Sequence, residues 1–133
     1  MKYFYFIISI FFLNLTFSSV VKTQIEYISN KKYISLNKFV DNHGVKKNYY
    51  AEKNKFWIGL YGNKVIFSEN CSYVKINDEI YQIFNPIILD NNSYYISLSS
   101  IELLLNSTIL PNAEVDTTNQ YLITDAPDYN IHS

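Results

Sequence analysis

The sequence contains no arginine and very little cysteine, histidine, glycine or proline. All 11 basic residues are lysines, and 12 acidic residues give a formal net charge of −1. This balance argues against a nucleic-acid-binding protein, because such a protein needs a concentrated basic surface to displace counterions from phosphate groups. We therefore expect no nucleic-acid partner.

The scarcity of metal-binding and phosphate-binding residues excludes several further classes of site. Cys71 is the single cysteine, which rules out an internal disulfide, and together with His43 and His132 it cannot supply the four ligands of a structural zinc site. Only three glycines occur, so little backbone can approach a phosphate closely. The motifs of serine hydrolases, zinc proteases, P-loops and calcium loops are all missing. We expect no cofactor, no metal site and no catalytic activity.

Two catalytic arrangements stay open as alternatives. Cys71 and His43 could form a nucleophile and its base, since a thiolate at neutral pH needs a nearby base or cation. Acidic residues such as Glu26, Asp41 and Glu102 could serve a small secreted enzyme, although no motif places a pair of them. The simpler interpretation puts Cys71 in or beside a hairpin turn and His43 at the C-terminal end of a helix, where the helix dipole favours it.

The N-terminus has the order of a secretory signal peptide. Met1 and Lys2 precede the apolar run Tyr3–Leu13, which is followed by a small and polar stretch ending at Ser18. The run has about 11 residues, whereas a helix that crosses a membrane needs about 20. We predict that residues 1–18 are cleaved and that the protein is secreted, periplasmic or held in the cell envelope, without a permanent membrane span. A buried first strand or helix is the alternative.

The rest of the chain has the size and composition of one domain. The hydrophobic content of 48% is enough for a single packed core. The length of 133 residues is too short for two domains of ordinary size. We assign this domain to residues 19–127 and predict a polar, flexible tail at residues 128–133.

A short internal repeat is the most informative feature of this domain. Tyr33-Ile34-Ser35-Leu36 returns 62 residues later as Tyr95-Ile96-Ser97-Leu98, and the same offset places Ile25 opposite Ile87. With three extra residues in the second copy, segment 56–58 aligns with 121–123. The repeat predicts two related strand-helix-strand units.

The periodicity of the apolar residues predicts two short helices. Leu36, Phe39 and Val40 form one helical face, with Ser35 or Asn37 as the N-cap and His43-Gly44 as the C-terminal stop. A second stripe, Leu98, Ile101, Leu104 and Leu105, predicts the other helix.

Period-two alternation dominates the rest of the domain. It predicts a strand beginning at Ile25, a short strand at 33–35, an antiparallel meander between residues 45 and 83, and a closing strand at 120–124. We therefore expect an α+β fold, a mainly antiparallel sheet with two short helices. The strands predicted for the meander are 49–51, 56–60, 64–67, 73–76 and 79–83.

These patterns resemble the copper amine oxidase N-terminal domain-like module. The matching pieces are Tyr33-Ile34-Ser35-Leu36, Val74-Lys75-Ile76-Asn77-Asp78-Glu79, Pro86-Ile87-Ile88 and Tyr95-Ile96-Ser97-Leu98. Such modules occur on secreted bacterial proteins, often ahead of cell-wall hydrolases such as N-acetylmuramoyl-L-alanine amidases. The resemblance does not imply copper, because the oxidase's own site needs a His-x-His pair that is missing from this sequence.

The resemblance implies a non-catalytic envelope module that binds or positions at the cell wall or cell surface. Its partner would be peptidoglycan or another envelope protein. The alternative is that the chain is the N-terminal part of an amidase-type hydrolase whose catalytic domain is not in this chain.

One strand offers candidate binding residues. Phe56, Ile58 and Leu60 share one face of a predicted strand, so alternation places Trp57, Gly59 and Tyr61 on the other. Trp57 and Tyr61 would then form an exposed aromatic platform on which a sugar ring or a peptide could stack. The alternative is that Trp57 belongs to the core, packed under a helix or against the second unit.

Overall fold

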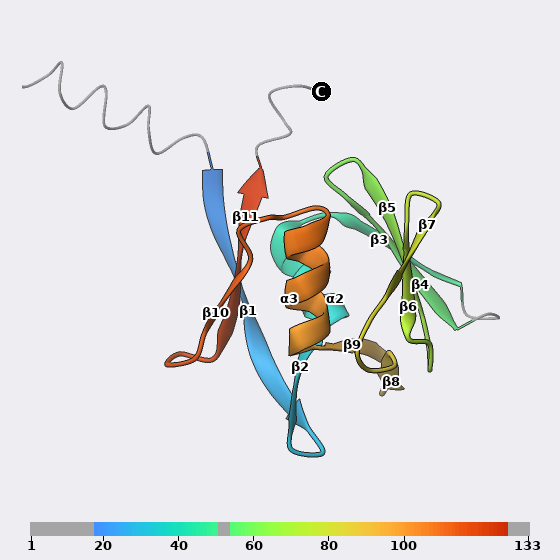
Figure 1. Cartoon of the computed structure of the whole chain (residues 1–133), viewed down its shortest axis with the longest axis horizontal. Helices are drawn as coiled ribbons and strands as arrows, with labels where there is room; N and C mark the ends of the chain where they lie inside the picture. The colour runs from blue at the N-terminus through green and yellow to red at the C-terminus, as the bar shows by residue number, and fades with distance from the viewer. Residues whose placement is uncertain (1–17, 51–53, 128–133) are drawn as a thin grey trace, which may run out of the picture.

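The computed structural model describes residues 18–50 and 54–127. The predicted signal peptide therefore lies outside the described residues except for Ser18, and the predicted tail lies outside them completely. The described chain forms two antiparallel sheets with two helices between them (Figure 1). This architecture agrees with the expected α+β class, but it divides the strands between two sheets, where the sequence predicted one.

The first sheet has six strands in the order β10-β11-β1-β2-β9-β8. Their bounds are β1 Ser18–Ile28, β2 Lys31–Ser35, β8 Ile88–Asp90, β9 Ser93–Ser97, β10 Glu114–Asp116 and β11 Tyr121–Pro127. Strand β1 begins seven positions before the predicted start at Ile25, because its first half pairs with β11 from Ser18↔Pro127 to Gln24↔Tyr121. That pairing joins the two ends of the described chain, which no local pattern could reveal.

The second sheet is the predicted meander, in the order β3-β4-β5-β6-β7. Its strands are β3 Lys46–Tyr50, β4 Lys55–Leu60, β5 Asn63–Ser68, β6 Tyr73–Ile76 and β7 Glu79–Gln82. The last four lie within one residue of the predicted bounds, whereas β3 begins three residues before the predicted start at Tyr49, because it pairs with β4 as far as Lys46↔Gly59. Phe56, Ile58 and Leu60 of β4 are buried, and the intervening residues of that strand are partly exposed. The sheet buries this apolar face against the helices instead of extending the edge of the first sheet, and that is why two sheets form.

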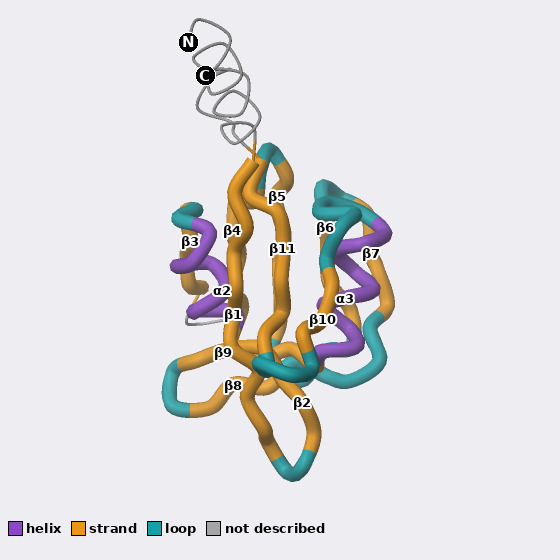
Figure 2. The backbone as a smooth tube through the Cα atoms, turned by 90° about the vertical axis from the view of Figure 1, so that its left-hand side faces the viewer, coloured by secondary structure: helices purple, strands orange, loops and turns teal. Residues whose placement is uncertain are grey.

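The helices are α2 (Leu36–His43) and α3 (Leu98–Ser107), which lie between the sheets in Figure 1 and to either side of β1 and β11 in Figure 2. The Ser35 side chain accepts a hydrogen bond from the Lys38 backbone N–H, so Ser35 is the N-cap. Asn37, the other cap candidate, instead accepts a hydrogen bond from the Tyr94 backbone N–H through Oδ1. Gly44 ends α2 with a φ of 67°, a left-handed conformation that glycine adopts without strain.

The two copies of the repeated motif pair directly with each other. In the β2–β9 ladder, Ile34 lies opposite Ile96, and both side chains are fully buried. In each copy the helix follows the strand directly, beginning at Leu36 and at Leu98. Farther along the chain the copies separate: segment 56–58 lies in β4 of the second sheet, whereas segment 121–123 lies in β11 of the first.

One hydrophobic core joins both sheets and both helices. The rings of Phe56 on β4 and Tyr94 on β9 stack at a centroid distance of 5.2 Å with an interplanar angle of 15°. The side chains predicted to form the helical stripes are all buried in this core, namely Leu36, Phe39, Val40, Leu98, Ile101, Leu104 and Leu105. The helix positions and their buried faces are thus confirmed.

Candidate binding face

The five-stranded sheet turns one side away from the core, and we call this side the outer face. Its side chains alternate with the buried ones and are brought together by the strand register. The outer face comprises Lys46, Asn48, Lys55, Trp57, Gly59, Lys64, Ile66, Ser68, Tyr73, Lys75, Ile80 and Gln82.

Trp57 lies on this outer face and outside the hydrophobic core. Its side chain is half-buried, and the Lys64 ammonium lies 5.5 Å from the centroid of the indole ring, within range of a cation–π interaction. A Cβ at Gly59 would lie 3.9 Å from Cζ3 of Trp57, so the ring extends toward this glycine. The alternative in which Trp57 belongs to the core is therefore wrong.

Tyr61 does not join Trp57 on the outer face. Strand β4 ends at Leu60, and Tyr61 and Gly62 form a turn with φ values of 48° and 83°, which interrupts the alternation. The ring of Tyr61 packs against the core, and its hydroxyl lies 2.7 Å from Nδ1 of His43. Burial raises the pKa of the Tyr61 hydroxyl above its usual value. The predicted two-ring platform is thus corrected to a single aromatic side chain, Trp57.

His43 connects three elements on the inner side of the molecule. Its Nδ1 meets the Tyr61 hydroxyl and its Nε2 meets the Thr124 hydroxyl on β11, both at 2.7 Å, while its ring packs on Phe39. Burial lowers the pKa of His43 to about 4. The imidazole is therefore neutral at pH 7, and desolvation outweighs the helix-dipole effect that would favour its charged form.

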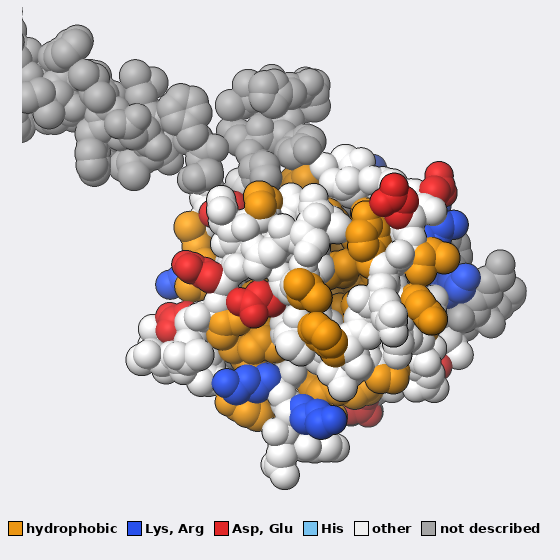
Figure 3. All heavy atoms as spheres, viewed as in Figure 1, with side chains coloured by type: hydrophobic (Ala, Val, Ile, Leu, Met, Phe, Trp, Pro, Cys, Tyr) orange, Lys and Arg blue, Asp and Glu red, His pale blue; other side chains and the backbone are white. Residues whose placement is uncertain are grey.

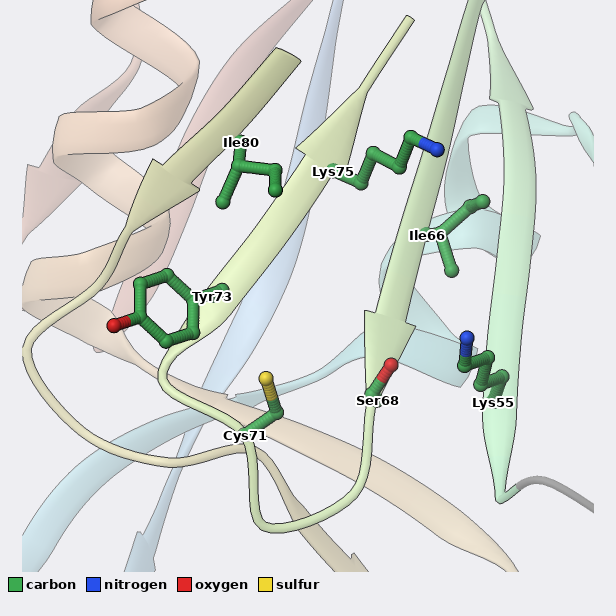
Figure 4. Close-up of a pocket in the computed structure, with 7 residues that line it drawn as sticks. All are labelled: Lys55, Ile66, Ser68, Cys71, Tyr73, Lys75 and Ile80. Carbon is green, nitrogen blue, oxygen red and sulfur yellow. The ribbon is translucent and has the colours of Figure 1, made fainter. Parts of the chain in front are cut away.

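The outer face contains a shallow groove of about 370 Å³. Side chains from β4, β5, β6 and β7 surround it, with Cys71 in the loop after β5 at one end (Figure 4). The lining residues are Lys55, Ile66, Ser68, Cys71, Tyr73, Lys75 and Ile80. Cys71 is a half-buried free thiol beside a turn, as the simpler interpretation expected.

The outer face carries an excess of positive charge. Lys46, Lys55, Lys64 and Lys75 all lie on it, and none of its outward-facing strand positions holds an aspartate or glutamate. Within the described residues, the one ion pair of these four lysines joins Lys75 to Asp78, at 3.9 Å with the aspartate fully exposed. Sequence reasoning missed this cluster, although the alternation of lysine with apolar residues in β4, β5 and β6 was a visible signal.

The residues considered for catalysis do not come together. Glu26 pairs with Lys38 at 3.3 Å and Asp41 pairs with Lys47 at 2.6 Å, while Glu102 lies on α3. Both ring nitrogens of His43 are engaged by Tyr61 and Thr124, so neither is directed to Cys71. Across residues 18–50 and 54–127, no group of three His, Cys, Asp or Glu side chains is arranged to hold a metal ion.

A second, smaller hollow of about 100 Å³ lies between β7 and α3. Hydrophobic side chains gather over α3 and the neighbouring edge of the second sheet in Figure 3, and Leu103 and Phe84 are 50% and 65% exposed. The side chains that line this hollow carry no charge: they are Tyr81, Gln82, Ile83, Ser100, Leu103, Leu104 and Ser107. It offers no charged group to select a ligand, so the outer face is the stronger candidate.

No protein-family model, no curated protein and no solved structure matches this chain. Neither of the two helices in the described part of the chain is long and apolar enough to cross a membrane.

Proposed function

We propose that this protein is a non-catalytic module of the cell envelope that binds wall material through the outer face of its second sheet. The observation that carries the proposal is the partly exposed side chain of Trp57 beside a groove bordered by lysines. The signal-peptide pattern at residues 1–18 and the resemblance to modules of secreted bacterial proteins support the envelope location. The mature protein would be exported and would position itself on the wall.

We also infer that the fold contains two related hairpin-helix units. The hairpin turns Ser29-Asn30 and Asn91-Asn92, which are 62 residues apart, all have positive φ values between 49° and 66°. The β1–β2 and β8–β9 ladders keep the same register at this offset, and each leads into a helix after a serine. Only the first unit is followed in the chain by the five strands of the meander. The outer face therefore belongs to a segment that the second unit lacks.

Substitution of Trp57 by alanine tests the proposed function. Truncation of a tryptophan that acts as a binding hot spot costs about 2 kcal/mol or more, so we expect about tenfold or greater loss of affinity for insoluble cell-wall material. The measurement is co-sedimentation of the purified protein with walls from a bacterium. Far-UV circular dichroism of the variant should match that of the wild type, because Trp57 lies outside the core.

Tyr27→Ala is the matched control for this experiment. Tyr27 is 58% exposed and lies on β1 of the other sheet, so its loss removes an aromatic side chain without touching the outer face. We expect the control to sediment with walls as the wild type does. Equal binding by Trp57→Ala and wild type, or no binding by the wild type, would contradict the proposal.

A further inference from the structure

We propose that the ligand of the outer face is an anionic wall polymer whose repeating units are joined by phosphodiesters. This inference rests on the proposed function and specifies which component of the wall is recognised. It concerns four lysines of the outer face, Lys46, Lys55, Lys64 and Lys75, and the groove that two of them, Lys55 and Lys75, line.

The four lysines are spread over the outer face at intervals that suit a repeating anion. Lys46 and Lys64 both lie opposite Gly59, on either side of it, so their Cα atoms are about 10 Å apart across two strand spacings. Lys75 lies opposite Ile66, two residues beyond Lys64, at roughly 8 Å from it. A single small anion would reach one or two of these ammonium groups, whereas an extended chain reaches several.

The whole molecule does not share this positive charge. The formal net charge of the chain is −1, and lysines such as Lys38 and Lys47 are paired with Glu26 and Asp41 on other surfaces. The outer face therefore has a positive electrostatic potential, because in the described chain its lysines lack close carboxylate partners except at Asp78. A polyanion gains affinity from such a field by releasing counterions on binding.

The shape of the face favours a polymer chain over a membrane. The groove is recessed, with Ile66 and Ser68 on the central strand β5 and with Lys55 and Lys75 on the strands to either side (Figure 4). A chain can lie in such a hollow, whereas a bilayer surface cannot follow it. The apolar side chains of Ile66 and Ile80 would contact the carbon atoms of the polymer units while the ammonium groups contact the phosphates.

The lysines of the outer face are suited to phosphate groups. An ammonium group binds phosphate as a point charge from many directions, so it can contact successive phosphates of an extended chain without one fixed geometry. The Lys64 ammonium over the Trp57 ring also partly covers the surface on which a neutral sugar would stack. Recognition of charge is therefore favoured over recognition of a neutral glycan.

The test compares binding to two preparations of one Gram-positive wall: intact wall, and wall treated with hydrofluoric acid, which cleaves phosphodiesters and leaves the peptidoglycan. We expect binding to the treated wall to weaken at least tenfold, and binding to the intact wall to weaken as salt is raised. Equal binding to both walls would overturn this inference and leave the proposed function standing. Failure to bind either wall would overturn both.

Charge variants localise the interaction. Lys55→Gln/Lys75→Gln removes two cations that line the groove, and we expect the loss of both charge contacts to weaken binding to intact wall by about tenfold. Lys31→Gln/Lys32→Gln removes the same net charge from the exposed β1–β2 hairpin and should change binding less than twofold. Equal losses in the two double variants would overturn the assignment to the outer face. Tighter binding to phosphatidylglycerol vesicles than to intact wall would overturn the polymer as the ligand.

Discussion

At the scale of single residues, His43 has the most specific environment in the molecule. Its imidazole bridges the hydroxyls of Tyr61 and Thr124, so it links the end of α2 to the β4–β5 turn and to β11 of the first sheet. A neutral imidazole offers one donor and one acceptor, and each hydroxyl can take either role, so both contacts are satisfied. Burial disfavours the charged ring, and the link between the two sheets is therefore made by the neutral form.

The low pKa of His43 predicts that the protein loses stability in mild acid. The pKa is about 4 in the folded protein and 6.5 for the unperturbed side chain, so the unfolded chain binds more protons between these values. The free energy of unfolding should therefore fall as pH drops from 6.5 toward 4. Above pH 6.5 the contribution of His43 to this free energy should be constant. We expect a loss of about 2 kcal/mol, allowing for the solvent-exposed part of the ring.

Urea unfolding at a series of pH values measures this dependence. The His43→Gln variant serves as the control, because glutamine can still donate and accept hydrogen bonds but does not titrate in this range. Its stability curve should be flatter than that of the wild type between pH 4 and 6.5. Parallel curves for the two proteins, or an NMR titration in which the His43 ring protonates near 6.5, would contradict the assignment.

At the scale of elements, the two helices hold the sheets apart and fill the space between them. Ser35 caps α2 through its side chain, whereas Ser97 at the start of α3 instead donates a hydrogen bond to Ser100, at 2.6 Å. Ser100 in turn accepts from the Phe84 backbone N–H, which connects α3 to the segment after β7. The second helix thus uses its first turn to hold the end of the meander.

Neighbouring leucines on α3 should differ sharply in their contribution to stability. Leu104 is 5% exposed and lies in the core, so Leu104→Ala should lower the free energy of unfolding by about 2–5 kcal/mol through lost burial and the cavity that remains. Leu103 is 50% exposed, and Leu103→Ala is the matched control, expected to cost less than about 1 kcal/mol. Chemical denaturation of both variants measures the difference, and similar costs would contradict the orientation of α3.

At the scale of the whole molecule, the two sheets behave as parts of one folding unit. The Phe56–Tyr94 stack joins β4 to β9, and backbone hydrogen bonds connect Asn70 and Cys71 with Ile87, at 2.8 and 3.1 Å. Neither sheet can bury its apolar face without the helices and the other sheet. A single core of this kind is expected to unfold in one cooperative transition.

This cooperativity can be measured with two probes. Fluorescence of Trp57, the single tryptophan, reports on the second sheet, and far-UV circular dichroism reports on all secondary structure. We expect the two urea transitions to coincide in the wild type. Phe56→Ala should lower the free energy of unfolding by about 3–5 kcal/mol and should move both midpoints together to lower urea. Ile80→Ala on the outer face should change the two midpoints little. Separate midpoints would show that the sheets unfold independently.

Local features of this protein could be predicted well from the sequence. The start of α2 at Ser35 or Asn37, its stop at His43-Gly44 and the alternation in β4 each depend on residues a few positions apart. Backbone preference and the pattern of apolar residues decide such features, because the competing conformations are also local. The same reasoning placed Phe39 and Ile101 in the core, as the structure confirms.

The arrangement of these pieces in space was decided only by the tertiary structure. The pairing of β1 with β11, the division of the strands into two sheets and the turning of Tyr61 toward His43 all depend on partners distant in sequence. The four lysines of the outer face likewise come from four strands and meet only through the register. Such pairings are chosen by which apolar faces can be buried together, a property of the whole chain that no short segment contains.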